Sequence, residues 1–278
     1  GASRAHQSAD TFPRSTNEPK NICIIGGKGG MGSLYARIGR QSDHNIFIID
    51  KDNWEELPEF ADTLDLAIVS VPINVTEQVI EQVAEQITTK TVLADFTSHK
   101  SMPLEKMLEE HDGPVMGLHP MHGPDVQNLS KQLLIVCEGR DTARGDWFID
   151  QCKLWGMRIK EANPEKHDHA MNMVQGLRHF VALLHGSFMK EYDLNPDDIL
   201  DFSSPIYRAE LMMTGRIFAQ DAELYADIVL SNEERRQLLL KFFEHHYRLA
   251  ELVKHGDKEG FVEEFEAITD FFGDFAQQ

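Results

Sequence analysis

Two histidines lie three residues apart in a segment rich in proline and glycine, GLHPMHGPD at residues 117–125. Proline fixes the backbone angle φ and glycine permits unusual angles, so we expect the side chain of His119 to be held in one direction. A neutral imidazole, with an ordinary pKa of about 6.5, can accept a proton at neutral pH. His119 is therefore our candidate general base, although an ordinary turn explains the segment equally well. For His122 we favour a turn histidine exposed to water.

A second polar segment, ADFTSHK at residues 94–100, also follows an apolar run and presents Asp95, Ser98 and Lys100. If both runs are neighbouring parallel strands, the residues after them meet at the same edge of the sheet. Ser98 can then hydrogen-bond both His119 and a substrate hydroxyl. An equally good role for Ser98 is to cap a helix predicted over residues 102–111.

A glycine-rich loop opens the predicted structure, with Gly27, Gly29 and Gly32 in the spacing GxGxxG after the apolar run NICIIG. Asp50 ends the next apolar run. In a dinucleotide-binding unit the three glycines allow a tight turn, the approach of a diphosphate and close packing of helix on strand, and the aspartate binds ribose hydroxyls. Asp50 would repel a 2′-phosphate, which favours NAD over NADP; Lys51 weakens this preference slightly. The predicted cofactor-binding residues are Gly27, Gly29, Gly30, Met31, Gly32, Asp50, Val71 and Pro72.

Two alternatives stay open, one for the role of the loop and one for the role of Lys28. The same residues can form a plain glycine turn beside a surface aspartate. Lys28, inside the loop, either adds positive charge to the site or is simply solvated.

Polar residues recur at helical spacing in the second half of the chain, in HDHAMNMVQGLRH. Asp168, Asn172, Gln175 and His179 share one face of a helix, and a solvated face is the usual explanation. Amides and a histidine in place of lysine and glutamate instead indicate the lining of a polar cleft.

Two arginines further along, Arg208 and Arg216, each lie in an apolar helical stretch, where a guanidinium requires an anionic partner. That partner is either a protein carboxylate or a ligand. In a chain with so few basic residues we favour a ligand.

Composition limits the classes of function. The 278 residues include 27 Lys plus Arg and 46 Asp plus Glu, a net charge of −19 that argues against nonspecific binding to nucleic acid or to anionic membranes. No apolar stretch approaches the roughly 20 residues that span a bilayer, and the first twenty residues lack a signal-peptide pattern, so we expect a cytoplasmic protein. The odd cysteine count without CxxC indicates no disulfide framework and no metal site.

The order of elements predicts the fold class. Apolar runs alternate with helical patterns at 30–40, 74–88, 102–111 and 144–155, which is typical of an α/β fold with a parallel, doubly wound Rossmann-type sheet. After NPEK at 163–166 every pattern is helical, with a helix start at Ser204–Pro205 and a capping box at Ser231–Glu234. We therefore predict a disordered linker or tag at 1–20, a dinucleotide-binding domain at 21–164 and an all-α domain at 165–278.

Taken together, these motifs resemble the prephenate dehydrogenase family of tyrosine biosynthesis from about residue 21 to the end. The resemblance is strongest to the dehydrogenase part of the bifunctional chorismate mutase and prephenate dehydrogenase of enteric-type bacteria, the T-protein. It implies that the mutase domain is absent here. The motifs are GxGxxG at 27–32, DFTSHK at 95–100, GLHPMHGPD at 117–125, EKHDHAM at 165–171 and SSPIYRAELMMTGRIFAQDAELYADI at 203–228.

The resemblance implies an activity and roles for residues. Members oxidatively decarboxylate prephenate to 4-hydroxyphenylpyruvate with NAD, form dimers through the helical domain and are commonly feedback-inhibited by tyrosine. The catalytic histidine of HPMxGP falls on His119, the serine of DxxSxK on Ser98 and the arginine for the ring carboxylate on Arg216. The HD pair falls on His167 and Asp168. The resemblance also places a histidine at His179, and we add Arg208 and Gln175 as substrate-binding residues.

Two positions depart from the family pattern. Pro124 stands where some relatives have threonine, and His122 replaces an apolar or aromatic residue. Three alternatives stay open: a β-hydroxyacid-type dehydrogenase, in which Lys100 would be the catalytic lysine; an arogenate dehydrogenase; and a noncatalytic module that senses NAD and an aromatic amino acid.

Overall fold

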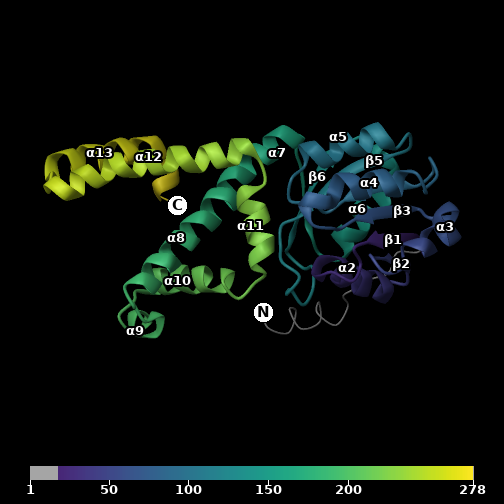
Figure 1. Cartoon of the computed structure of the whole chain (residues 1–278), viewed down its shortest axis with the longest axis horizontal. Helices are drawn as coiled ribbons and strands as arrows, with labels where there is room; N and C mark the ends of the chain where they lie inside the picture. The colour runs from purple at the N-terminus through teal and green to yellow at the C-terminus, as the bar shows by residue number, and fades with distance from the viewer. Residues whose placement is uncertain (1–17, 278) are drawn as a thin grey trace. The chain divides into compact units, whose positions relative to one another are not determined.

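The computed structural model describes residues 18–277, which form two compact units, one ending at Met171 and the other beginning at Asn172 (Figure 1). Residues 1–17 of the predicted linker lie outside the described residues. The first unit includes α7 (Pro164–Met171) because this helix packs against α5 (Ser101–Glu110). The predicted domain limits, 21–164 and 165–278, stay a prediction.

The first unit is built on a seven-stranded sheet in the order β2-β1-β3-β4-β5-β6-β7. Its central strands are continuous runs of Ile, Leu, Val, Ala and Cys, as expected where helices cover both faces. The strands are β1 (Asn21–Ile25), β2 (Asn45–Ile49), β3 (Leu66–Val69), β4 (Val92–Asp95), β5 (Val115–Pro120), β6 (Leu133–Glu138) and β7 (Arg158–Glu161).

The direction of β6 departs from the predicted parallel sheet. β6 runs antiparallel to β5, and β7 is parallel to β6, while the first five strands are all parallel. Residues 121–132, between β5 and β6, contain no helix, and a parallel return needs a crossover element. The loop therefore turns the chain back directly, and it leaves His119 near the end of β5.

Helices cover both faces of the sheet, which confirms the predicted Rossmann-type fold. One apolar cluster joins the strands to α2 (Gly30–Gln41) and α6 (Asp146–Leu154), and the other joins them to α4 (Thr76–Ala84) and α5. A short helix, α3 (Leu57–Phe60), follows β2. Cys23, Cys137 and Cys152 are buried free thiols.

The second unit is all helical over its described residues, as predicted. It opens with a π-helical segment, Asn172–Leu177, and α8 packs against α10 and α11, while α12 packs against α11 and α13. The helices are α8 (Arg178–Glu191), α9 (Pro196–Asp201), α10 (Pro205–Ile217), α11 (Ala222–Leu230), α12 (Glu233–His255) and α13 (Lys258–Phe272). Within residues 18–277, no helix has both the length and the apolar character needed to cross a membrane.

Helix caps agree with the predictions at one site and differ at another. The Ser204 side chain accepts a hydrogen bond from the N–H of Tyr207 and begins α10, as expected. The capping box at Ser231 is wrong by one residue, because the Asn232 side chain caps α12 through the N–H of Arg235. Asparagine caps helices at least as well as serine, so the adjacent residue takes the role.

Candidate active site

The glycine loop joins β1 to α2, and its shape depends on positions where a side chain does not fit. Gly26 has a φ of 80°, and a Cβ atom there would lie 2.2 Å from the carbonyl oxygen of Ser70. A Cβ atom on Gly32 would lie 2.4 Å from the carbonyl oxygen of Gly26. Gly26 therefore makes the tight turn together with the predicted Gly27, whose Cβ would lie 2.9 Å from the carbonyl oxygen of Ile24. The double glycine after the strand was the available signal for Gly26.

The first turn of α2 is a potential anion site. Gly29 is the N-cap residue and has no side chain with which to cap the helix, and the first turn contains no acidic residue. Gly30, Met31 and Gly32 therefore offer backbone N–H groups at the positive end of the helix dipole, while the Met31 side chain packs against the apolar core. This cradle fits the diphosphate of a dinucleotide.

Asp50 lies directly after β2 and contacts the same loop. Its Oδ2 atom accepts a hydrogen bond from the Lys28 N–H at 3.1 Å. The Lys28 side chain pairs with Asp52 at 2.5 Å, so it is partly neutralised rather than simply solvated. Val71 lies beside the loop, since its Cγ1 atom would be 3.0 Å from a Cβ on Gly26. Pro72 is the next residue.

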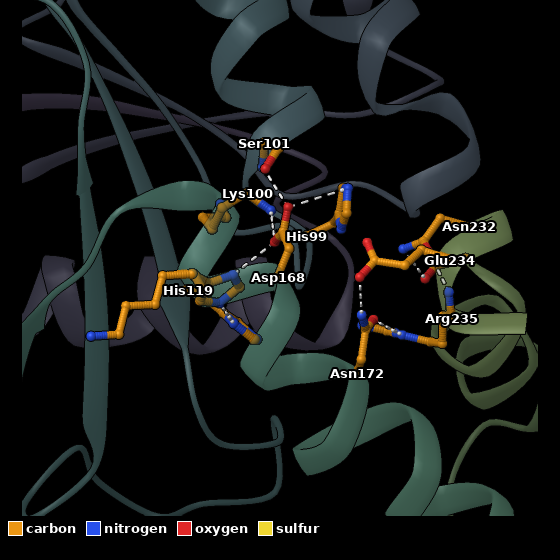
Figure 2. Close-up of polar contacts among 12 residues, drawn as sticks. His99, Lys100, Ser101, His119, Asp168, Asn172, Asn232, Glu234 and Arg235 are labelled. Carbon is orange, nitrogen blue, oxygen red and sulfur yellow. Dashed lines mark hydrogen bonds and ion pairs between the residues drawn. The ribbon is translucent and has the colours of Figure 1, made fainter. Parts of the chain in front are cut away.

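The His119 side chain, only 4% exposed, is the first member of a chain of hydrogen bonds. Its Nδ1 atom lies 2.8 Å from Nε2 of His167, and Nδ1 of His167 lies 2.8 Å from Oδ1 of Asp168 (Figure 2). The two imidazole rings are nearly perpendicular, at 74°. The residues come from β5 and α7, so packing of α7 on the first unit assembles the chain.

Asp168 also holds the start of α5. Its carboxylate accepts hydrogen bonds from the backbone N–H groups of Lys100 and Ser101, each at 2.8 Å, and lies 3.4 Å from Nε2 of His99 (Figure 2). Burial raises the pKa of this carboxyl, but the hydrogen bonds from His167 and Ser101 and the charge of His99 hold that pKa well below its ordinary value. Asp168 is therefore an anion at neutral pH.

A carboxylate at this position determines which ring nitrogens carry protons. Asp168 can only accept, so the proton of neutral His167 is on Nδ1 and its Nε2 atom is an acceptor. The Nδ1 atom of His119 must then donate to His167, which leaves the lone pair of neutral His119 on Nε2. This is the tautomer that a general base requires.

Ser98 has neither of its expected contacts in the structure. Lys100, not Ser98, is the N-cap residue of α5, and Asp168 satisfies the first N–H groups of that helix. The capping role is therefore wrong. In the described part of the chain the half-buried Ser98 hydroxyl forms no hydrogen bond, so its bond to His119 stays a prediction.

Lys100 is fully buried and supports the loop that carries Ser98. Its Nζ atom donates to the Asp95 carboxylate and, at 2.7 Å, to the carbonyl oxygen of Leu118. Burial lowers the pKa of Lys100, while the charge of Asp95 opposes that shift. The pair closes residues 96–99 into a loop and fixes it to β5.

His122 is not the water-exposed turn histidine that the sequence suggested. The residue is half-buried, and its Nε2 atom lies 3.1 Å from the hydroxyl oxygen of Tyr35 on α2. The aromatic partner is 87 positions away in sequence, so no local pattern could indicate it.

The predicted substrate-binding residues of the second unit lie on α10, the π-helical segment and α8. Arg208 and Arg216 are exposed on α10, and Nη2 of Arg208 donates to the carbonyl oxygen of Leu200 at 2.9 Å. Gln175 lies in the π-helical segment. Burial, followed by the charges of Arg178 and Arg235, lowers the pKa of His179 to about 4. His179 is thus neutral at pH 7.

Arg235 is a residue that the sequence interpretation missed. It is only 1% exposed, and its Nε atom donates to Oδ1 of Asn172 at 3.1 Å. A Cβ atom on Gly176 would lie 2.7 Å from Cδ of Arg235, so glycine makes room for the arginine. Asp168 and Asn172 are both buried, and the interpretation as a solvated face is wrong for these two residues.

Comparison with known proteins matches both halves of the chain. The model described as the prephenate dehydrogenase nucleotide-binding domain matches residues 41–144, and that of the prephenate dehydrogenase dimerization domain matches residues 163–267. The chain is 39% identical over 276 residues to the T-protein of Haemophilus influenzae, covering 99% of this chain and 73% of that protein. Identity to the T-protein of Enterobacter agglomerans is also 39%, over 94% of this chain and 70% of that protein.

A solved structure shares the fold. The crystal structure of prephenate dehydrogenase from Aquifex aeolicus, in complex with hydroxyphenyl propionate and NAD+, superposes with a TM-score of 0.70 at 18% identity. The match covers 92% of this chain and 98% of that one.

Gly32→Ala tests the glycine cradle. The new Cβ would meet the Gly26 carbonyl oxygen at 2.4 Å, so the loop must shift and we expect the affinity for NAD to fall by more than about 10-fold. Titration calorimetry measures this. Gly215→Ala is the matched control, because no atom beyond its chain neighbours and the adjacent backbone of its own helix lies within 4 Å of its Cβ position. Unchanged NAD affinity in Gly32→Ala would contradict the assignment.

Proposed function

Because the chain belongs to the prephenate dehydrogenase family, we propose that it converts prephenate to 4-hydroxyphenylpyruvate and carbon dioxide with NAD, in tyrosine biosynthesis. The expected family, the dehydrogenase class and NAD as cofactor are confirmed by the matches. The observation that best supports this reaction is the hydrogen-bonded chain from Asp168 through His167 to His119. This chain leaves a basic ring nitrogen on His119.

The reaction requires one general base and little acid catalysis. The substrate hydroxyl loses its proton to Nε2 of His119 while hydride leaves the same carbon, and loss of carbon dioxide makes the ring aromatic. Bound NAD supplies the acceptor for the hydride. General-base catalysis of this kind contributes about 10²- to 10⁴-fold to the rate. Ser98, on the loop after the neighbouring strand β4, orients the hydroxyl.

NAD is held by the residues of the glycine cradle. The N–H groups of Gly30, Met31 and Gly32 would bind the diphosphate, and Gly27 and Gly29 would allow its approach. Asp50 would accept hydrogen bonds from the adenosine ribose, and Val71, beside Gly26, would contact the cofactor together with Pro72.

The two carboxylates of prephenate need cationic partners. We assign the ring carboxylate to Arg216 and place Arg208, Gln175 and His179 among the other substrate contacts. With a pKa of about 4, His179 acts as a neutral hydrogen-bonding group and not as a cation. Arginine supports this role because its planar guanidinium matches a carboxylate with two parallel hydrogen bonds.

The structure argues against the β-hydroxyacid type of dehydrogenase. Lys100, its candidate catalytic lysine, is fully buried on Asp95 and the Leu118 carbonyl and has no exposed surface for a substrate. Arogenate differs from prephenate only in an amino group in place of a keto group on the side chain, and it stays the alternative substrate.

We also propose feedback inhibition by tyrosine, which shares the aromatic ring and the three-carbon side chain of the product.

A homodimer through the second unit is part of the proposal. Val253 on α12 and Phe261, Phe265 and Ile268 on α13 are between 45% and 73% exposed and line an apolar groove of about 570 Å³. Apolar surface of this kind is typical of an interface, and the match to a dimerization domain supports a second copy as the partner.

The buried, unpaired thiols support a cytoplasmic location.

NADH formation tests the function directly. We expect the protein to produce NADH from NAD with prephenate, more slowly with arogenate and not with 3-hydroxyacids. Added tyrosine should inhibit NADH formation.

Arg216→Ala should raise the KM for prephenate by about 10- to 100-fold, the range of a lost charge-assisted contact, without weakening NAD binding. Absence of NADH with every substrate, in protein that binds NAD, would leave the sensing module as the better account.

Asp168→Asn tests the hydrogen-bonded chain. An amide can donate to His167 and reverse both tautomers, so we expect kcat to fall by about 10²- to 10⁴-fold while the affinity for NAD changes little. His119→Asn should have a similar effect, and the double variant should be no worse than His119→Asn alone. Since Asp168 also caps α5, the melting temperature is measured alongside. More than half of the wild-type kcat in a folded Asp168→Asn variant would contradict this role.

Phe265→Asp tests the dimer. We expect light scattering to give twice the chain mass of 31.7 kDa for the wild-type protein and a smaller mass for Phe265→Asp, because a buried unpaired charge disfavours association. Leu154→Asp, on exposed surface of the first unit, is the control and should stay dimeric. A wild-type monomer, or a dimer unaffected by Phe265→Asp, would refute the assigned face.

A further inference from the structure

Tyr35 connects the glycine-loop helix to both candidate catalytic loops. It lies on α2, is only 2% exposed, and its ring centroid is 4.5 Å from that of Phe96, two residues before Ser98. On another side its ring stacks on His122, three residues after His119, with centroids 5.9 Å apart. The Tyr35 side chain, which belongs to the cofactor-binding helix, therefore contacts residues of both the loop after β4 and the loop after β5.

The hydrogen bond between Tyr35 and His122 has a defined direction. Nδ1 of His122 lies 2.9 Å from the carbonyl oxygen of Gly123, which can only accept, so the proton of the neutral ring is on Nδ1. Nε2 can then only accept, and it takes the single Tyr35 hydroxyl proton at 3.1 Å in preference to the weaker sulfur acceptor, Sδ of Met157, at 3.7 Å. Burial lowers the pKa of His122, outweighing the opposing effects of the Gly123 carbonyl and Asp125, and so favours this neutral acceptor.

The loop at residues 121–127 follows α2 from its first turn onward. Pro124 lies at the start of the helix, where its side chain would be 2.9 Å from a Cβ on Gly30. Further along, Nη2 of Arg37 donates to the carbonyl oxygen of Gln127 at 3.5 Å. Between these two points along the helix, the partly buried hydrogen bond from Tyr35 to His122 joins α2 to the loop.

We propose that the Tyr35–His122 hydrogen bond is a latch that fixes the 121–127 loop against the first turn of α2 and thereby shapes the wall of the dinucleotide site. Tyr35 and His122 are positioning residues, since neither needs to touch the cofactor. The latch rests on the proposed function only through NAD binding at this helix. His119 is held separately by His167, so loss of the latch weakens NAD binding and spares the chemical step.

The test compares variants of the 278-residue chain by titration calorimetry with NAD and by NADH formation from prephenate. Tyr35→Phe removes one hydroxyl and keeps the buried ring, and we expect the Kd and the KM for NAD to rise by about 3- to 10-fold, the range of one hydrogen bond. kcat should change less than about 2-fold. Tyr192→Phe, which removes an exposed hydroxyl on the second unit, is the control and should match wild type.

Substitution of His122 separates the hydrogen bond from packing. His122→Gln keeps an acceptor and should bind NAD nearly as the wild type does, whereas His122→Leu should weaken binding as much as Tyr35→Phe. The double variant Tyr35→Phe/His122→Leu should be no weaker than either single variant, because both remove the same interaction. Equal NAD affinity for the Gln and Leu variants, or a fall in kcat without a rise in the Kd for NAD, would overturn the latch.

The two proposals fail in different ways. If the wild-type protein binds NAD but does not oxidise prephenate, the proposed reaction is refuted. The calorimetric comparison of the variants would still test the proposed Tyr35–His122 latch. Full activity of the wild type combined with an unchanged NAD affinity in Tyr35→Phe would end the latch alone.

Discussion

The carboxylate of Asp168 is the interaction on which the rest of the site depends. It accepts hydrogen bonds from the Nδ1 atom of His167 and from two backbone N–H groups at the start of α5. These bonds keep it ionised despite burial, and an ionised acceptor leaves each imidazole only one tautomer. Because the same group also caps α5, the orientation of His119 and the position of the loop before that helix depend on one negative charge.

The sheet brings the participating loops to one edge. β4 and β5 are adjacent and parallel, so the loop with Ser98 and the end of β5 with His119 lie at the same carboxyl ends. The buried pair of Lys100 and Asp95 fastens these neighbours together through the Leu118 carbonyl. Burying two charges is costly unless they are paired and hydrogen-bonded, and here both conditions are met for the lysine. The pair is therefore better explained by positioning than by proton transfer.

Local patterns were enough to predict much of this architecture. Periodicity indicated α2 and α5 to within a residue, and the GxGxxG spacing after an apolar run indicated the cradle, because helices and glycine turns depend on neighbouring residues. The sequence also singled out His119, since a residue directly before a proline is locally constrained.

The features that were missed all depend on tertiary contacts. The capping role expected for Ser98 is taken by Asp168, which is 67 positions from Ser101. The buried Arg235 meets Asn172 across 63 positions, and no helical period reveals such a pair. The antiparallel direction of β6 was readable in principle, because the segment after β5 lacks any helical pattern that could form a crossover.

The tautomer of His119 is the central claim, and nitrogen NMR measures it most directly. Protein labelled with ¹⁵N at its histidines, studied near pH 7.5, would be assigned by comparison with a His119→Asn sample. The account predicts that the proton of His119 is on Nδ1, with Nε2 unprotonated, and that Asp168→Asn shifts this pattern. A proton on Nε2 of neutral His119 in the wild-type protein would contradict the account, because the lone pair of the ring would then be on Nδ1, which faces His167.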